Sequence, residues 1–371
     1  MKKIYYITAV FATLFLVGCG DGIDLPGVNV ETDLNKIPLP DNNVNLEQVE
    51  LKPSTEPMLH EGLHTEADFQ RIRDKKAAGE EPWVSAYQLL VESQFSQKTA
   101  DTYPTEWIKR GVSGDENYMN AARGATIAYQ QALRWKIEQD DEYAAKAVEN
   151  LNKWVQTCVG VTGNTNLSLA AGLYGYEFAI AGELLRDYGG WDRADFAAFQ
   201  NWLLKVFYPA NDDFLKRHHD TNALHYWANW CLCNIAAKMA IGIVTDRRDI
   251  YNEGIDHLQT GDTNGRLRRA IYHDYAPDYN FAQWQESGRD QGHTLMCVGL
   301  MGIICQLAWS QGDDFFAYDD NLFMRACEYA ACCNYTNETV PYTTYIWQKQ
   351  SQWGYPIPEE QTTLGGGKWI K

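Results

Sequence analysis

The stretch NALHYWANW, residues 222–230, places one imidazole and two amides among aromatic side chains. His225 and Asn229 are four residues apart, so on a helix they would share one face. A neutral histidine can take a proton from carbon, and an amide can stabilise charge on the adjacent carboxylate. This is the combination that β-elimination from a uronic acid requires. A hydrogen-bonded core histidine is the alternative interpretation of His225.

A second polar stretch, NGRLRRAIYHDYA at 264–276, gathers positive charge and phenols. A nearby arginine lowers the pKa of a tyrosine below its usual value of about 10, so such a tyrosine can act as the general acid. A solvated basic loop is the alternative. The residues concerned are Arg266, Arg268, Arg269, Tyr272, His273 and Tyr275.

The stretch ESGRDQGH at 286–293 is the third dense polar cluster. Arg289 can hold a carboxylate through two parallel hydrogen bonds. His293 follows four residues later, on a helix that we predict to begin here. We interpret the cluster, with Glu286, as a substrate subsite or a second carboxylate clamp. A helix cap with a buried ion pair is the alternative.

The elements that must position these residues are helices. Apolar residues recur at i, i+3, i+4 and i+7, and no comparable run of alternating β-branched residues competes with them. The fold class is therefore all-α. The predicted helices lie near 66–76, 83–95, 117–138, 141–157, 167–186, 192–208, 222–244, 247–258, 290–311 and 319–334.

The predicted helices are of two kinds. Those at 167–186, 222–244 and 290–311 are apolar nearly all round, whereas those that follow them carry charge on one face. This alternation predicts an incomplete (α/α) toroid or barrel of about six or seven helical pairs, with a plain helical solenoid as the alternative.

In a toroid the amino ends of the inner helices open on one mouth, where unpaired N–H groups favour an anionic ligand. The predicted substrate-binding residues are Asn166, Asn222, Trp230, Arg269, Glu286, Arg289 and His293.

Composition excludes some classes of partner. The chain has 32 Lys and Arg against 49 Asp and Glu, a net charge of −17, so nucleic acid is not expected to bind. Of the nine cysteines, those after Cys19 mostly lie in apolar stretches without paired CxxC spacing. We expect buried free thiols, with a disulfide as the alternative, and no metal site or cofactor.

The amino terminus predicts export. MKK, an apolar run and LVGC at 16–19 match a signal peptide, residues 1–18, that ends at a lipobox with Cys19 as the lipidated residue. Residues 19–58 are rich in Pro, Asn and acids, which is typical of a flexible tether, and 59–371 form the toroid domain. We expect an outer-membrane lipoprotein, anchored by its lipid and facing the periplasm or the cell surface.

Three sequence blocks carry a resemblance to a known family. YWANW at 226–230, TDRRD at 245–249 and RAIYHDYA at 269–276 resemble, in order, blocks of the bacterial alginate lyases that fold as α/α toroids. With QWQESGRDQGHT at 283–294, the whole is similar to Bacteroidetes lipoproteins of polysaccharide lyase family 38. The resemblance covers most of 160–335, and the blocks are specific only when taken jointly.

The resemblance implies metal-independent β-elimination of a polyuronate, either alginate, with poly-mannuronate preferred, or glucuronan. In the family an Asn and an Arg neutralise the carboxylate, a His is the base and a Tyr is the acid. Tyr272 matches the family tyrosine, and Arg266 most nearly matches its arginine, one residue closer than expected.

The histidine departs from the family pattern. The alginate lyases have an Asn-His pair two residues before Tyr-Trp, where this chain has Ala223 and Leu224. His225 is displaced by one position and becomes the candidate base, with Asn222 and Asn229 as candidate amides. The alternative bases are His218 and His219.

Two other functions stay open. Toroids also house glycoside hydrolases that act on uronate oligosaccharides and need paired carboxyls, for which Glu286, Asp290 and Asp220 are candidates. A non-catalytic glycan-binding lipoprotein would use the same aromatic and arginine side chains without chemistry.

Overall fold

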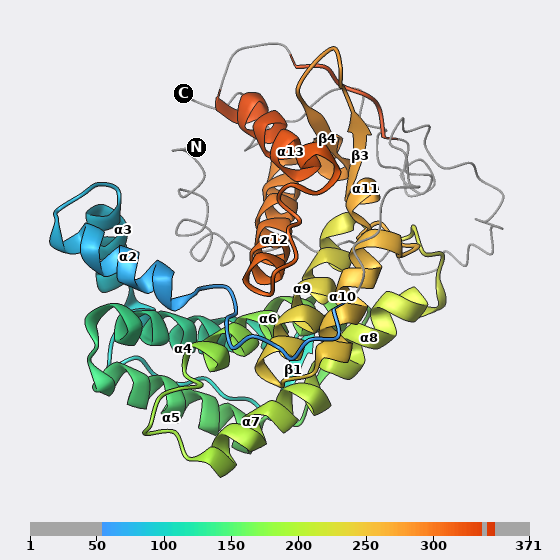
Figure 1. Cartoon of the computed structure of the whole chain (residues 1–371). Coiled ribbons are helices and arrows are strands. Elements are labelled where there is room, and N and C mark those ends of the chain that lie inside the picture. The colour runs from blue at the N-terminus through green and yellow to red at the C-terminus, as the bar shows by residue number, and fades with distance from the viewer. Residues whose placement is uncertain (1–53, 336–339, 346–371) are drawn as a thin grey trace.

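A computed structural model describes residues 54–335 and 340–345 (Figure 1). The signal peptide, Cys19 and residues 20–53 of the tether lie outside the described residues, as do 346–371 of the domain. The helices are α2 (Glu66–Ala77), α3 (Trp83–Glu92), α4 (Tyr118–Glu138), α5 (Asp141–Thr157), α6 (Leu167–Leu184), α7 (Arg193–Val206), α8 (Tyr208–Arg217), α9 (Ala228–Val244), α10 (Arg248–Thr260), α11 (Leu267–Ala270), α12 (Gln291–Ser310) and α13 (Tyr318–Tyr335).

Consecutive helices pair, as α4 with α5, α9 with α10 and α12 with α13 (Figure 1). Helices α6 and α9 are buried almost all round, whereas α5 and α10 bury one face and expose the other. This alternation of buried and half-exposed helices confirms the all-α prediction and matches an incomplete α/α toroid.

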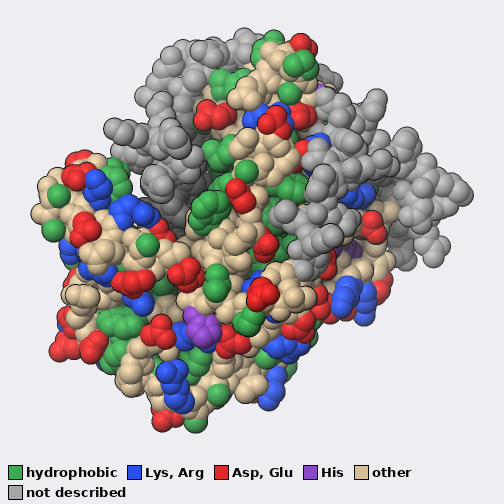
Figure 2. Space-filling model, viewed as in Figure 1, with side chains coloured by type: hydrophobic (Ala, Val, Ile, Leu, Met, Phe, Trp, Pro, Cys, Tyr) green, Lys and Arg blue, Asp and Glu red, His purple; other side chains and the backbone are tan. Residues whose placement is uncertain are grey.

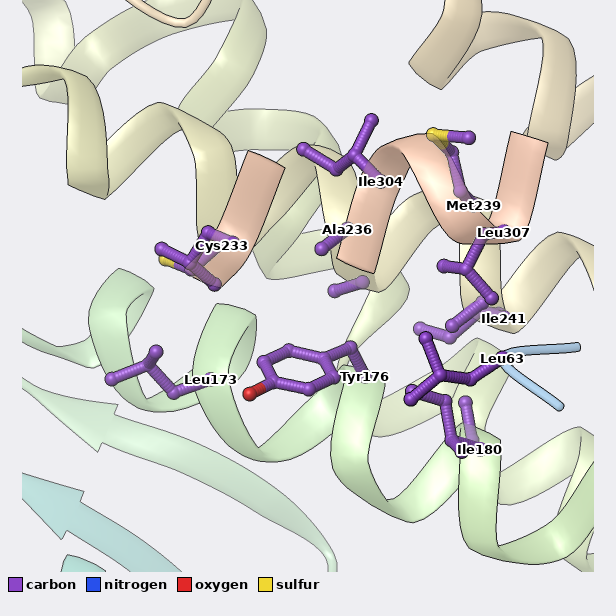
Figure 3. Close-up of a cluster of buried hydrophobic side chains, with 14 of the residues drawn as sticks. Leu63, Leu173, Tyr176, Ile180, Cys233, Ala236, Met239, Ile241, Ile304 and Leu307 are labelled. Atoms are coloured by element: carbon purple, nitrogen blue, oxygen red, sulfur yellow. The ribbon is translucent and has the colours of Figure 1, made fainter. Parts of the chain in front are cut away.

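The core lies where α9 is packed between α6 and α12. Figure 3 shows side chains of these three helices meeting there: Leu173, Tyr176 and Ile180 from α6, Cys233, Ala236, Met239 and Ile241 from α9, and Ile304 and Leu307 from α12. Helix α12 is long and apolar enough to cross a membrane by length and composition, but much of it is buried against α9 and α13.

Short strands interrupt the helical pattern, which the sequence did not predict. Strands β1 (Trp107–Arg110) and β2 (Gly160–Gly163) pair in parallel. Strands β3 (Ile271–Asp274) and β4 (Ala282–Trp284) pair antiparallel, with an irregularity between Ile271 and His273. Runs of three or four residues are too short for an alternating pattern to stand out from helical periodicity.

Residues 54–58, which the sequence predicted to end the tether, contact the folded residues. The carbonyl groups of Glu56 and Pro57 accept hydrogen bonds from Arg248, at 2.8 and 2.9 Å, and the side chain of Met58 is buried. Residues 54–58 therefore belong to the folded domain, because backbone polar groups and one apolar side chain fix them to it.

The cysteines follow the expectation of free thiols. None of the eight in the described residues forms a disulfide. Five are buried, namely Cys158, Cys231, Cys233, Cys297 and Cys305, and they fill core positions.

Candidate active site

The amino ends of α9 and α12 lie together. The backbone N–H of Ala228, the first residue of α9, donates to the side-chain oxygen of Gln285 at 2.8 Å, and the next N–H, of Asn229, donates to Glu286 at 3.3 Å. Both acceptors belong to the short 3₁₀ helix η5 (Gln285–Gly288) that precedes α12. Two orphan N–H groups of α9 are thus satisfied by the turn that begins α12.

The amino end of α6 is connected to the same region by contacts of His219. Ser168 Oγ, in the first turn of α6, lies 2.9 Å from His219 Nε2, and the ring of His219 packs against Tyr226 with centroids 5.8 Å apart. Asn166 occupies the N-cap position of α6 and is half-buried. Contacts therefore link the amino ends of the three helices α6, α9 and α12, and the predicted mouth is the region around them.

Helix α9 begins at residue 228 rather than 222, and this corrects the predicted geometry of His225. The side-chain oxygen of Asn222 accepts from the N–H of Leu224 at 2.8 Å, and its carbonyl accepts from the N–H of His225 at 2.9 Å. Such a side-chain turn competes with helix formation. His225 consequently lies in a loop and does not share a helix face with Asn229.

The loop that holds His225 is fixed by a buried amide. Asn264, which is almost fully buried, donates from Nδ2 to the carbonyl of Tyr226 at 2.8 Å and to that of Leu224 at 3.2 Å. The segment before α11 is thereby bound to both sides of His225, and Arg266 is the N-cap residue of α11. The structure therefore brings together the two sequence stretches that were expected to carry the base and the acid.

Asn229 does not face the mouth. Its side chain is 1% exposed, Nδ2 lies 3.6 Å from Met296 Sδ, and Oδ1 is buried without a hydrogen-bond partner in the described part of the chain. Of the two candidate amides, Asn222 lies in the loop of His225 and is half-buried. Trp230, also half-buried, packs against the ring of Tyr226 with centroids 4.7 Å apart.

Tyr272 lies in an aromatic cluster that joins three parts of the chain. Its ring meets Tyr345 edge to face with centroids 5.0 Å apart, and Tyr345 contacts Trp227 at 5.9 Å. Trp227 is two residues from His225. Tyr272 and the His225 loop therefore lie on the same side of the molecule, joined by Trp227, Tyr345 and the partly buried Trp230.

The hydroxyl of Tyr272 has two partners. It donates to the carbonyl oxygen of Thr343 and accepts from Gln283 Nε2 at 3.2 Å. The Gln283 amide also donates to the Thr343 carbonyl at 2.9 Å and accepts from the Thr343 N–H at 2.9 Å. Tyr272 is only 1% exposed, because Gln283 and Thr343 both contact its hydroxyl.

The pKa of Tyr272 differs from the sequence prediction. Burial raises the pKa of its hydroxyl well above the usual value of about 10, and neighbouring tyrosines raise it further. The expected lowering by a nearby arginine is wrong, because desolvation is the largest contribution. At neutral pH Tyr272 is protonated, which suits a general acid.

The three arginines at 266–269 have separate environments. Arg268 forms a buried ion pair with Asp319, and Arg269 donates to the carbonyl of Asp262. Burial lowers the pKa of both guanidinium groups, and the charge of Arg266 lowers both further. Arg266 therefore lies close enough to Arg268 and Arg269 to affect their charge. Of the three, Arg268 is held in place by its ion pair with Asp319.

Arg289 lies over the ring of Trp227, with its guanidinium carbon 5.1 Å from the ring centroid. It donates to Glu286 at 3.0 Å, and Glu286 is fully buried. Asp290 caps α12 by accepting from the N–H of His293 at 2.8 Å, and its other oxygen lies 2.6 Å from His293 Nδ1. The helix cap and the ion pair are both present, so Glu286 supports Arg289 from beneath.

The two alternative histidines differ in access. Burial lowers the pKa of His218 to about 4, and its ring is covered by Phe214 and bonded to Cys231 Sγ at 3.5 Å. His219 is half-buried, and burial also lowers its pKa. Both residues adopt positive φ angles, 48° and 52°, which non-glycine residues avoid outside strained or functional segments.

The carboxyls proposed for a hydrolase are engaged elsewhere. Glu286 binds Arg289 and the amino end of α9, Asp290 caps α12, and Asp220 pairs with Arg217 at 3.0 Å. Each carboxylate has a structural partner, and the buried Glu286 does not reach the mouth.

Sequence reasoning missed several residues that build the site. Gln283 and Gln285 are buried and lie two residues apart, a Q-x-Q spacing that on a strand would place them on the same face. This spacing of amides between aromatic residues was the available signal. Thr343 and Tyr345 carry no local signal, because their role comes from contact with residues about sixty or seventy positions earlier in the chain.

The visible surface offers no broad attraction for a polyanion. Figure 2 shows acidic side chains scattered over the described part of this face, with basic ones among them. Because the whole chain also carries a net charge of −17, we expect an anionic chain to be attracted by local groups such as Arg266, Arg269 and Arg289.

Comparisons with known proteins agree with the helical fold described above. The family model described as alginate lyase matches residues 72–338. No curated protein matches the sequence.

Among solved structures, an alginate lyase from Bacteroides ovatus is similar with a TM-score of 0.55 and 15% identity, over 80% of this chain and 86% of that one. Alginate lyase A1-III from Sphingomonas species A1 is similar with a TM-score of 0.53 and 13% identity, over 83% of this chain and 93% of that one. A variant of A1-III complexed with a tetrasaccharide also matches, with a TM-score of 0.53 and 13% identity, over 83% of this chain and 92% of that one.

These likenesses show a common α/α toroid fold, and the family model spans most of the chain, including all three polar stretches. The chain therefore belongs to the alginate lyase family of polysaccharide lyases.

Proposed function

We propose that the protein cleaves alginate, preferentially its poly-mannuronate segments, by metal-independent β-elimination. The observation that carries this proposal is the aromatic cluster of Trp227, Tyr272 and Tyr345, because Tyr272 is the predicted acid and Trp227 is two residues from His225, the predicted base. The family match and the tetrasaccharide bound to the A1-III variant support a polysaccharide as the substrate. A place in polysaccharide lyase family 38 is part of the proposal and rests on the sequence blocks at 226–230, 245–249, 269–276 and 283–294.

The reaction assigns one step to each group. His225 removes the proton from C5 of a uronate, the electron pair forms the C4–C5 double bond, and the bond from C4 to the glycosidic oxygen breaks. Tyr272 donates its proton to the departing oxygen. Arg266 and Asn222 stabilise the charge that develops on the carboxylate, an effect worth several kcal/mol in a preorganised site.

Asn222 replaces Asn229 in this role, because Asn229 is buried beneath the mouth while Asn222 belongs to the His225 loop. Arg289, held over Trp227, is the second carboxylate clamp. Asn166, Trp230, Arg269 and His293 remain predicted substrate contacts around the mouth.

The decisive experiment incubates the purified protein with alginate, poly-mannuronate, poly-guluronate, glucuronan and hyaluronan. A lyase produces a double bond conjugated with the carboxylate, which absorbs in the near ultraviolet. A hydrolase releases reducing ends without that absorbance, and a glycan-binding protein does neither. Absorbance that rises fastest with poly-mannuronate supports the proposal, and reducing ends alone would refute it.

The base is tested by substitution. His225→Ala is expected to lower kcat on poly-mannuronate by about 10²–10⁴-fold, as loss of a general base does. His219→Ala is the matched comparison, since both rings pack against Tyr226. If His219→Ala abolishes turnover and His225→Ala does not, the base is His219.

We also propose that Cys19 carries a lipid that holds the enzyme at the outer membrane, in contact with periplasmic or extracellular polysaccharide. Expression of the full chain with Cys19→Ala is expected to move the protein from the membrane fraction to the soluble fraction. Mass spectrometry of the wild-type amino terminus should detect acyl chains; an unmodified amino terminus contradicts the proposal.

A further inference from the structure

Arg110 is a buried cation that has no counter-ion among the described residues. Its side chain is 6% exposed, and no residue in 54–335 or 340–345 forms a hydrogen bond or ion pair with its guanidinium. The other buried arginines of the described chain each bind a carboxylate, as Arg134, Arg186, Arg268 and Arg325 do. Burying an unpaired charge costs several kcal/mol, so this exception requires an explanation.

An aromatic ring holds Arg110 from one face only. The guanidinium carbon lies 4.6 Å from the ring centroid of Tyr118, at the start of α4, and Tyr118 stacks with Tyr174 of α6 at 6.5 Å. A cation above a ring is stabilised through its flat face, which leaves the N–H groups on its edge available. Two of those groups match the two oxygens of a carboxylate.

Glycines fix Arg110 beside the start of α6. Arg110 is the register partner of Gly163, whose φ is +144° and whose absent Cβ would lie 1.7 Å from the Arg110 carbonyl oxygen. The next residue, Gly111, has φ +78°, and its absent Cβ would lie 1.8 Å from Asn164 Oδ1. That oxygen accepts from the N–H of Asn166 at 2.9 Å.

A continuous series of contacts leads from this point to the candidate base. Asn166 is the N-cap of α6, and Ser168 in its first turn bonds to His219 at 2.9 Å. His219 packs against Tyr226, the neighbour of His225. Arg110 therefore lies beside the amino ends of α4 and α6, whereas Arg289 lies beside those of α9 and α12.

We propose that Arg110 binds the carboxylate of a uronate at a subsite separate from the one where the glycosidic bond breaks. The inference rests on the proposed function, since a polyuronate offers a carboxylate on every sugar. A chain that crosses the mouth from Arg289 to Arg110 presents carboxylates to both. Arg110 binds the chain without acting in the elimination.

The test compares Arg110→Gln with Lys109→Gln, which removes the same charge from the neighbouring residue. Lys109 is partly exposed and pairs with Asp115 at 2.5 Å. Because Arg110 contributes binding and not chemistry, Arg110→Gln is expected to raise KM for poly-mannuronate about tenfold or more with kcat within about threefold of wild type. Lys109→Gln is expected to keep KM within about twofold.

Arg110→Lys separates binding from folding. It keeps the charge and much of the apolar stem but cannot form two parallel hydrogen bonds, so an intermediate KM with an unchanged melting temperature supports the subsite. If Arg110→Gln and Arg110→Lys fold as wild type and both show the KM of Lys109→Gln, the inference is wrong.

Direct binding distinguishes the failure of this inference from the failure of the proposed function. Calorimetry measures the affinity for a saturated tetramannuronate of two proteins, the Tyr272→Phe variant and the same variant with Arg110→Gln added. Binding that weakens with Arg110→Gln supports the subsite, even if wild-type protein forms no unsaturated product and the lyase proposal fails. Equal binding by both proteins overturns the subsite, whatever the turnover of the wild type.

Discussion

The side-chain amide of Gln283 donates a hydrogen bond of 3.2 Å to the hydroxyl oxygen of Tyr272. A donor at this oxygen would stabilise the phenolate formed when Tyr272 gives up its proton in the proposed reaction. Gln283→Glu replaces the donor by a carboxylate of the same shape. We expect kcat to fall about tenfold or more, and the alkaline limb of the kcat profile to move to higher pH, because the added negative charge raises the pKa of Tyr272.

The matched control is Gln285→Glu, at an equally buried residue whose side-chain amide donates to the hydroxyl of Tyr345 at 2.7 Å and not to that of Tyr272. Initial rates across the pH range measure both variants. An identical loss in both, with no movement of the alkaline limb, would assign Gln283 a structural role only.

Tyr272→Phe tests the acid directly. Loss of the proton donor is expected to lower kcat by about 10²–10⁴-fold, while stability falls by about 1 kcal/mol through the lost hydrogen bond to Thr343. Tyr275→Phe is the comparison, since its hydroxyl bonds to the same Gln283 at 2.5 Å and to Thr343 at 3.1 Å. Comparable turnover in the two variants would remove Tyr272 from the mechanism.

The buried carboxyl of Glu177 should make the free energy of unfolding depend on pH. Burial raises the pKa of its carboxyl to about 8, with Tyr176 as a hydrogen-bond partner, and one oxygen is buried without a partner in the described residues. Between about pH 4.5 and 8 the folded state holds a proton that the unfolded state has released, so stability falls as pH rises through this window.

Glu177→Gln removes that dependence. We expect it to stabilise the protein by up to a few kcal/mol at about pH 8 and by little near pH 4.5, as thermal unfolding measures. Glu92→Gln, at an exposed carboxylate of α3, should change neither value. A melting temperature of Glu177→Gln that differs from wild type equally at both pH values would contradict the assignment.

We expect substitution of Arg268 to lower the stability of the protein and substitution of Arg266 to lower its catalytic rate. Arg268→Ala leaves Asp319 buried and unpaired, so we expect a loss of about 3–5 kcal/mol in chemical denaturation. Arg266→Ala should unfold at nearly the wild-type denaturant concentration but lose about 10²–10³-fold in kcat, as removal of a charge-stabilising group does. The reverse pattern would mean that Arg268 is the catalytic arginine.

The helices of this fold could be predicted because their periodicity is local. The helix over 141–157 begins and ends as predicted, with Asp140 as its N-cap. The start of α9 could not be predicted in this way. Asn222 turns the chain through its own side chain, and the cap of α9 comes from Gln285 and Glu286, more than fifty residues later. Contacts so distant in sequence leave no trace in a helical pattern.

The sequence predicted which residue types form the candidate site, but not which of those side chains a substrate can reach. The residue types that gather at the mouth are those that the polar stretches contain, yet Asn229 and Glu286 are buried beneath it. Access depends on which side chains cover a residue, and for Tyr272 the cover comes from Thr343 and Tyr345. The pKa of Tyr272 follows from the same cover, which is why an argument from neighbouring charges gave the wrong direction.

Tyr272, the proposed general acid, donates its hydroxyl proton to the Thr343 carbonyl in this structure. To reach a sugar oxygen, the phenol must first release that carbonyl. The carbonyl is not stranded when this happens, because the second N–H of Gln283 already reaches it at 2.9 Å. In the proposed reaction Tyr272 therefore exchanges the Thr343 carbonyl for the glycosidic oxygen, while that carbonyl keeps its hydrogen bond to Gln283.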